Sequence, residues 1–104
     1  MSTERVYLGV GSNLGDRKAN IEYAARRMSR VLEGFVTSSL YETPPMYRED
    51  QPKFLNCVFG GNATGRRVAA GPYKLLELIR EIERETGRDR EKSGPMGPRP
   101  IDID

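Results

Sequence analysis

Residues 6–16 read VYLGVGSNLGD, a stretch that contains a strand, a turn and the start of a helix. Val6–Val10 is a short apolar run, which predicts a buried strand. Residues 11–16 combine glycine with Ser, Asn and Asp, so they predict a turn with helix-capping side chains. The glycine spacing fits neither a dinucleotide fingerprint nor a Walker loop. We therefore favour a tight strand-to-helix turn here over a helix N-terminus that binds an anion.

The segment after this turn has the spacing of an amphipathic helix. Its apolar stripe consists of Ile21, Ala24, Ala25, Met28, Val31 and Leu32. Gly34 fits as the terminator of this helix. A strand is expected over residues 35–41, and Thr43-Pro44-Pro45 ends it because consecutive prolines cannot donate to a ladder.

Three further elements are expected in the second half of the chain. Residues 54–61, FLNCVFGG, predict a third strand. Gly71 and Pro72 open a second helix, which Gly87 closes. The apolar stripe of that helix is Leu75, Leu76, Ile79 and Ile82. Residues 88–99 are expected to form a long loop, and residues 101–104 begin a fourth strand.

The resulting order is strand, helix, strand, strand, helix, strand. It predicts an α/β (α+β) fold of the ferredoxin-like βαββαβ type, with an antiparallel sheet and both helices on one face. The last strand is expected to be incomplete, since only four residues remain for it. A chain of 104 residues suits a single domain, 1–104, with one modest core.

Composition restricts the chemistry that this chain can perform. A net charge of +2 does not favour binding to nucleic acid or to a membrane surface. The chain contains no histidine, which removes most zinc chemistry and the usual hydrolase triads. Cys57 is the single cysteine, which excludes an internal disulfide, and we expect it in the core. Residues 1–5 lead directly into the first strand, so we expect no signal peptide and a cytoplasmic protein.

Asp102 and Asp104 alternate with Ile101 and Ile103 at the end of the chain. Residues two apart on a strand share a face, so both carboxylates would point one way and both isoleucines into the core. Neighbouring carboxylates repel unless a cation lies between them, and magnesium prefers such oxygen ligands. The alternative is a half-buried strand with a solvated polar face, which residue types alone favour.

The cations that precede this acid pair favour the metal-binding interpretation of the two aspartates. They are Arg80, Arg84, Arg88, Arg90, Lys92 and Arg99. Arginine forks match phosphate oxygens, and cations near a metal-binding acid pair are what a polyphosphate site needs. The alternative is a solvated charged loop that Asp89 and Glu91 partly neutralise.

Asn56 interrupts the apolar strand over residues 54–61. A buried carboxamide needs hydrogen-bond partners, and it could read the edge of a planar heterocycle with Phe54 packed against the ring. An asparagine that faces solvent at a sheet edge is an equally good interpretation.

Five stretches together resemble one enzyme family. They are YLGVGSNLGDR, SSLYETPPMY, DQPKFLNCV, LLELIREIERETGRDR and GPRPIDID, which follow the family's order along the whole chain. The chain is thus similar to 6-hydroxymethyl-7,8-dihydropterin pyrophosphokinases of folate biosynthesis. The resemblance implies transfer of pyrophosphate from ATP to the hydroxymethyl group of a reduced pterin, with release of AMP. Such transfer relies on positioning, metals and cations, so a chain without histidine can support it.

The resemblance also implies roles for individual residues. Asp102 and Asp104 would hold two Mg²⁺ ions that bridge the phosphates of ATP to the acceptor hydroxyl. The pterin site would consist of Thr43, Pro44, Met46, Phe54 and Asn56. The ATP site would include Arg80, Glu83, Arg88, Arg90 and Arg99, with Arg88 and Arg99 in catalytic contact with the phosphates.

The resemblance further implies that residues 1–104 are the N-terminal two-thirds of the family's domain. We therefore expect weak or absent turnover for these residues alone, and a monomer whose partners are ATP and the pterin. The alternatives are a non-catalytic fragment that binds nucleotide or pterin and, with less support, a ferredoxin-like RNA-binding module.

Overall fold

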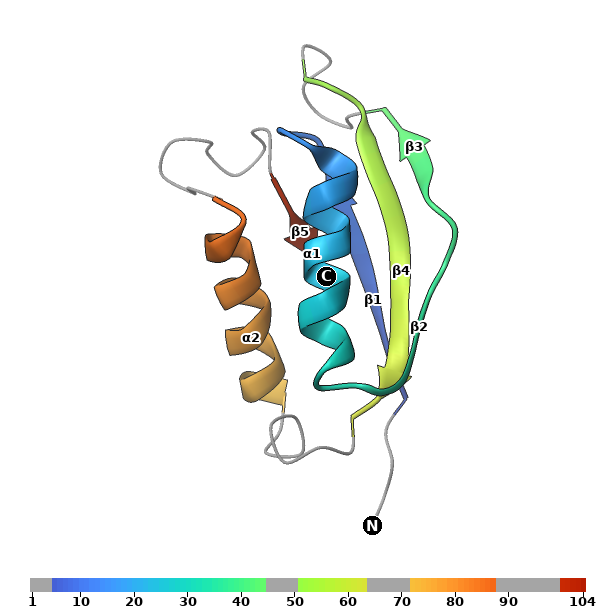
Figure 1. Ribbon diagram of the computed structural model, residues 1–104, viewed down its shortest axis with the longest axis vertical. Coiled ribbons are helices and arrows are strands. Elements are labelled where there is room, and N and C mark those ends of the chain that lie inside the picture. The colour runs from blue at the N-terminus through green and yellow to red at the C-terminus, as the bar shows by residue number, and fades with distance from the viewer. Residues whose placement is uncertain (1–4, 45–50, 64–71, 88–99) are drawn as a thin grey trace.

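The computed structural model describes residues 5–44, 51–63, 72–87 and 100–104, apart from the side chains of residues 72–74. These residues form five strands and two helices (Figure 1). In chain order the elements are β1 (Arg5–Ser12), α1 (Arg17–Ser29), β2 (Glu33–Thr37), β3 (Tyr41–Thr43), β4 (Phe54–Asn62), α2 (Pro72–Glu85) and β5 (Asp102–Ile103).

The strands form one antiparallel sheet in the order β2-β4-β1-β5, and β3 also pairs with β4. β1 and β4 are therefore central, and their pairing extends from Arg5 opposite Asn62 to Ser12 opposite Leu55. Both helices lie on the same face of the sheet (Figure 1). The described elements thus confirm the α+β, ferredoxin-like fold.

The core lies between the helices and this face of the sheet. Its buried side chains come from both helices, from alternate strand positions, from the turn after α1 and from the residue before β5. They are Leu8, Val10, Ile21, Ala24, Met28, Val31, Leu32, Cys57, Phe59, Ile79, Ile82, Ile101 and Ile103. Cys57 is a core residue, as predicted, and burial raises the pKa of its thiol. Leu76, predicted in the stripe of the second helix, is instead exposed, and the neighbouring Leu78 packs against the core.

The first strand is longer than the sequence predicts. Gly11 and Ser12, expected in the turn, belong to β1 because both pair with β4. The turn begins after them, and Asp16 is the N-cap of α1, where its carboxylate accepts a hydrogen bond from the Ala19 N–H at 3.1 Å. The predicted capping side chain is confirmed.

Gly34 does not terminate α1, contrary to the prediction. The helix already ends at Ser29, and Val31 and Leu32 turn into the core. Gly34 lies in β2 with a φ of 61°, where the register with β4 shifts between Glu33 and Val36. A glycine in this left-handed conformation suits a β-bulge, which explains its place.

The single strand predicted over residues 35–41 is two strands, β2 and β3. Ser38 lies between them and pairs with Val58 of β4 in an unusual way. Its backbone N–H donates to the Val58 carbonyl at 2.9 Å, while its hydroxyl accepts from the Val58 N–H at 2.8 Å. A side chain thus replaces a backbone carbonyl, and the regular ladder is interrupted here.

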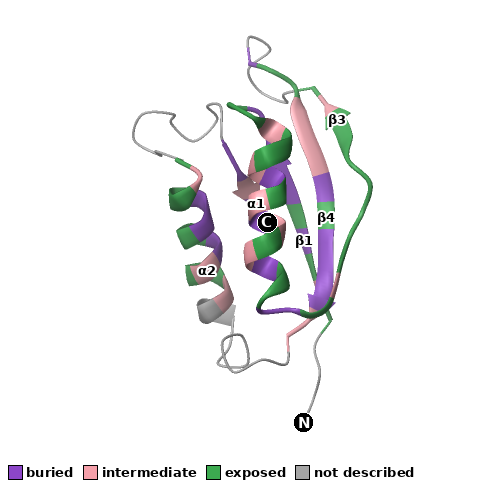
Figure 2. Cartoon of the chain, viewed as in Figure 1, coloured by how far each residue is buried: buried purple, intermediate pink, exposed green. Residues whose placement is uncertain are grey.

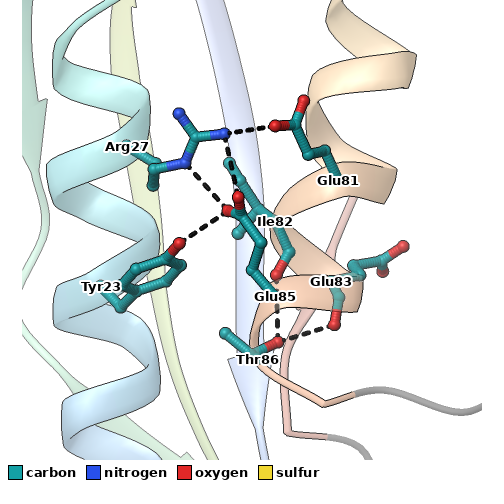
Figure 3. A network of polar contacts seen from close by, with 7 residues as sticks. All are labelled: Tyr23, Arg27, Glu81, Ile82, Glu83, Glu85 and Thr86. Carbon is teal, nitrogen blue, oxygen red and sulfur yellow. Dashed lines mark hydrogen bonds and ion pairs between the residues drawn. The ribbon is translucent and has the colours of Figure 1, made fainter.

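A polar network joins α1 to α2 (Figure 3). Arg27 donates to Glu81 at 3.0 Å and to Glu85 at 2.9 Å, and the Tyr23 hydroxyl donates to Glu85 at 2.7 Å. The hydrogen bond from Tyr23, followed by that from Arg27, holds the pKa of the Glu85 carboxyl below its ordinary value. The network therefore fixes the C-terminal half of α2 against α1.

Neither of the two described helices has the length and apolar character needed to cross a membrane. Buried and exposed residues alternate along α1 and α2, as the purple and green segments in Figure 2 show.

Candidate functional site

The open face of the sheet carries a row of residues that links four strands. Tyr41 of β3 lies opposite Asn56 of β4, Asn56 lies opposite Gly11 of β1, and Gly11 lies opposite Asp102 of β5. Opposed residues share a face. Because the adjacent Val10 is buried beneath the helices, the row lies on the other face. Asn56 and Asp102 are then two strand spacings, or about 10 Å, apart.

Asn56 is held in one orientation at its end of this row. Its Nδ2 donates to the Thr43 hydroxyl at 2.7 Å, with longer contacts of 3.4 Å to the carbonyls of Tyr41 and Phe54. These acceptors use the donor side of the carboxamide. The remaining Oδ1 is the atom closest to the position that a Cβ at Gly11 would occupy. Asn56 therefore presents a hydrogen-bond acceptor toward the middle of the row.

Gly11 leaves room for that acceptor. A Cβ at this position would lie 3.0 Å from Asn56 Oδ1 and 3.2 Å from Phe54 Cδ1, so a neighbour would have to move. Gly9, two residues earlier on the same face, has nothing within 4 Å of the corresponding position. β1 thus provides a strip without side chains between Asn56 and β5.

Asp102 and Asp104 lie at the other end of the row. Ile101 and Ile103 are buried, while Asp102 is half-buried and Asp104 is exposed, which confirms the predicted alternation. Backbone hydrogen bonds of 2.8 and 3.1 Å pair Asp104 with Gly9. Two residues along a strand correspond to about 7 Å, so both carboxylates face the glycine strip from neighbouring positions.

The donor set of this acid pair suits a hard divalent cation. Across the described segments of the chain, no group of three or more Cys, Asp or Glu side chains could hold a metal ion. Two carboxylates would therefore need further oxygen ligands from water or from a bound phosphate. Magnesium commonly binds in this way, through one or two carboxylates together with substrate phosphates.

Of the remaining predicted site residues, three belong to the described part of the chain and four do not. Arg80 is exposed and Glu83 is buried on α2, which packs on the helix-covered face. In Figure 3 the Glu83 carboxylate points away from α1. Pro44 is exposed directly after β3. Met46, Arg88, Arg90 and Arg99 lie outside the described residues. The structure thus brings Thr43, Phe54 and Asn56 into contact and aligns the acid pair with them.

Comparison with protein-family models identifies the family of the chain. Residues 7–104 match the model of the 7,8-dihydro-6-hydroxymethylpterin-pyrophosphokinase family. The chain belongs to this family.

Similar proteins in the pyrophosphokinase family include bacterial and plant proteins. A 2-amino-4-hydroxy-6-hydroxymethyldihydropteridine pyrophosphokinase of Bacillus subtilis (strain 168) is 40% identical over 100 residues, which cover 94% of this chain and 56% of the relative. A protein of the same name from Aquifex aeolicus (strain VF5) is 38% identical over 99 residues, 95% of this chain and 58% of the relative. A folate synthesis bifunctional protein of Arabidopsis thaliana is 38% identical over 102 residues, which cover 97% of this chain and 20% of that protein. The chain therefore spans somewhat over half the length of the two bacterial relatives.

Two residues that support the site of this pyrophosphokinase-family chain were not singled out from the sequence. Asn13 is buried, and its Nδ2 donates to Gln51 Oε1 at 3.1 Å and to the Pro52 carbonyl at 3.2 Å. Arg17 donates to the Lys53 carbonyl at 3.0 Å. Both connect the β1–α1 turn with the entry to β4. The sequence did mark these residues as notable, because they lie within the family-like stretches YLGVGSNLGDR and DQPKFLNCV. Sequence spacing does not, however, predict that these two stretches contact each other.

Proposed function

We propose that this chain carries the pterin-binding and metal-binding face of an enzyme that transfers pyrophosphate from ATP to 6-hydroxymethyl-7,8-dihydropterin, with release of AMP, in folate biosynthesis. Family membership supports this reaction. The observation that carries the proposal is the row from Asn56 through Gly11 to Asp102. This row combines the carboxamide acceptor of Asn56, a strip without side chains and an acid pair on one face, with about 10 Å between Asn56 and Asp102.

At one end of the row, Asn56 and Phe54 would bind the pterin. The ring edge carries N–H donors, and Asn56 Oδ1 is an acceptor whose orientation Thr43 fixes. The half-buried Phe54 ring offers a flat apolar surface beside it. Pro44 and Met46, which follow β3 in the chain, complete the proposed wall.

At the other end, Asp102 and Asp104 would hold two Mg²⁺ ions together with ATP. Bound magnesium supplies charge neutralisation of the phosphates and orients them toward the acceptor hydroxyl. The two carboxylates would position the phosphates above the glycine strip. Tighter binding of the metal with ATP than without it is expected, because the phosphates provide the missing oxygen ligands.

The cationic part of the site remains a proposal from the family resemblance. Arg88 and Arg99 would contact the phosphates and offset the charge that develops during transfer. Arg80, Glu83 and Arg90 would contribute to ATP binding, and α2, which carries the first two, contacts β5. A monomeric state and a cytoplasmic location also remain predictions, and sedimentation measures the first.

The test measures by calorimetry how tightly the protein binds a non-hydrolysable ATP analogue and 6-hydroxymethylpterin, with and without Mg²⁺. Asp102→Asn removes the charge at nearly constant shape, so we expect Mg²⁺-dependent affinity for the analogue to fall more than about tenfold. Glu22→Gln is the matched control, because Glu22 is an exposed acid on α1. Equal affinities for the Asp102→Asn and wild-type proteins would remove the metal role.

A second measurement, of AMP released from ATP and the pterin, separates catalysis from binding. Release that depends on Asp102 supports the transferase. Binding without release selects the non-catalytic fragment, and tight salt-dependent affinity for RNA would instead select the nucleic-acid module.

A further inference from the structure

Arg17, the first residue of α1, reaches across to two segments that border the proposed pterin site. Its Nη1 donates to the Lys53 carbonyl at 3.0 Å, and its Nη2 donates to Glu42 Oε1 at 2.8 Å. The second contact is also an ion pair between half-exposed side chains. The guanidinium lowers the pKa of the Glu42 carboxyl, chiefly through this hydrogen bond.

The position of Glu42 makes this contact more than a surface ion pair. β3 has only three residues, Tyr41, Glu42 and Thr43, and it pairs with β4 through those three positions. Neighbouring residues of a strand point to opposite faces. Glu42 therefore points toward the helix layer, where Arg17 meets it, and Thr43 points toward the open face, where its hydroxyl accepts from Asn56.

The same guanidinium also fixes the other strand of this pair. Lys53 directly precedes β4, and the carbonyl that Arg17 holds lies three residues before Asn56. Asn13 anchors the preceding Pro52 carbonyl from the same turn. Figure 1 shows the start of α1, β3 and the start of β4 at the same end of the molecule. One side chain thus bridges the two strands whose hydrogen-bond acceptors set the carboxamide orientation.

We propose that Arg17 is a positioning residue for the pterin site, which fixes the spacing of β3 and β4 and thereby the orientation of the Asn56 carboxamide. The identity of the ligand rests on the proposed function. The effect on orientation does not, because it concerns contacts within the chain.

The first readout is therefore independent of any ligand. In ¹H–¹⁵N spectra, Arg17→Ala and Glu42→Gln should shift the side-chain NH₂ signals of Asn56, and should accelerate hydrogen exchange at the backbone amides of β3. Lys18→Ala is the matched control, because it removes one charge from the neighbouring exposed position on α1. Glu42→Gln keeps the test valid if Arg17→Ala does not fold, since an exposed Glu→Gln change leaves the packing intact.

The second readout is the affinity for 6-hydroxymethylpterin, measured by calorimetry in the presence of Mg²⁺ and the ATP analogue. The expected effect is that of losing one exposed ion pair, so Glu42→Gln should weaken binding of the pterin about two- to fivefold. The affinity for Mg²⁺ and the ATP analogue alone should not change, because the acid pair lies two strands away. The charge-swapped protein with Arg17→Glu and Glu42→Arg should recover part of the loss.

The outcomes separate the two proposals. Unchanged Asn56 signals in both Arg17→Ala and Glu42→Gln overturn the positioning role, whatever the ligand does. Shifted Asn56 signals with no affinity for the pterin in any variant, the wild type included, overturn the proposed function and retain the positioning role. A uniform fall in stability with unchanged Asn56 signals and unchanged pterin affinity would reduce the contact to a surface ion pair.

Discussion

Gly11→Ala tests the candidate site with the smallest change that the chain allows. Gly11 does not have a positive φ, so alanine can adopt its backbone conformation. The new Cβ would lie 3.0 Å from Asn56 Oδ1 and 3.2 Å from Phe54 Cδ1, while ordinary contact begins at 3.4 Å. The shortfalls are 0.4 and 0.2 Å. Both neighbours belong to the proposed pterin site, so any relief of the overlap must displace them.

The expected loss of stability is the difference between two effects. Overpacking costs about 1–3 kcal/mol, and replacing glycine by alanine returns about 0.4–1 kcal/mol through the unfolded chain. The balance is a destabilisation of about 1 kcal/mol, which corresponds to a fall in Tm of about 4–8 °C for a chain of this size. Gly9→Ala is the control for this measurement, because nothing lies within 4 Å of its Cβ position and no fall is expected.

The effect on pterin affinity should be larger. Rotation of the Asn56 carboxamide away from Gly11 would leave one polar group of the bound ring without its partner, at about 1–3 kcal/mol, or about 5- to 150-fold in affinity. Calorimetric titration with 6-hydroxymethylpterin measures this loss. In an Asn56→Ala background the same Gly11→Ala change should have a much smaller effect, since its closest neighbour is gone. If the Gly11→Ala protein keeps the pterin affinity and the Tm of the wild type, the reasoning is refuted.

Two further predictions concern stability. Ser12 is fully buried, and its hydroxyl has no hydrogen-bond partner in the structure as described. Ser12→Ala should therefore raise Tm, by about 4–8 °C if the unpaired hydroxyl costs about 1 kcal/mol; a fall in Tm would contradict this, and Ser29→Ala, which removes a bonded hydroxyl, is the control. The lowered pKa of Glu85 means that its contribution to the stability of the fold is present above its ordinary pKa of 4.5. This contribution is lost as pH falls through the pKa of Glu85 in the folded protein. The raised pKa of Tyr23 means that its contribution to the stability of the fold is present below its ordinary value of 10.0 and is lost as pH rises through its pKa in the folded protein. Tm measured against pH should thus show a plateau between these limits, and Glu85→Gln should make the fall in Tm less steep at both ends. An unchanged profile would show that the network between the helices does not contribute to the pH dependence of Tm.

The sequence predicts the order and type of the elements because periodicity is a local property. Ile21, Ala24 and Met28 of the predicted stripe are buried on α1, and a capping side chain lies within the predicted turn. The alternation of buried isoleucine with more exposed aspartate over residues 101–104 was also correctly predicted. Each depends on side chains within a few residues of one another.

The errors occur where a distant strand decides the outcome. Gly34 follows a helical stripe and reads as its terminator, yet its conformation serves a bulge against β4. Residues 35–41 have the composition of one strand, and the hydroxyl of Ser38 divides it because Val58 lies opposite. Pairing partners of this kind are not encoded in local spacing.

The candidate site shows the same division. Asp102, Asn56 and Phe54 were singled out because an acid pair and a carboxamide on apolar strands are locally conspicuous, and the family resemblance then supplied the roles proposed for them. Gly11 was predicted as part of a turn, and its position between Asn56 and Asp102 follows only from the register of three strands. Arg17 and Asn13 act through contacts that span more than thirty residues of chain.

The hydroxyl of Ser38 has a consequence for how the molecule behaves at high concentration. The outer border of the sheet presents five residues of β2 and three of β3, with a break between them, and not one long run of unsatisfied amides and carbonyls. A strand of a neighbouring molecule could therefore form backbone hydrogen bonds along only a short length of this border. Ser38 thus limits strand-by-strand association of neighbouring molecules along this border of the sheet.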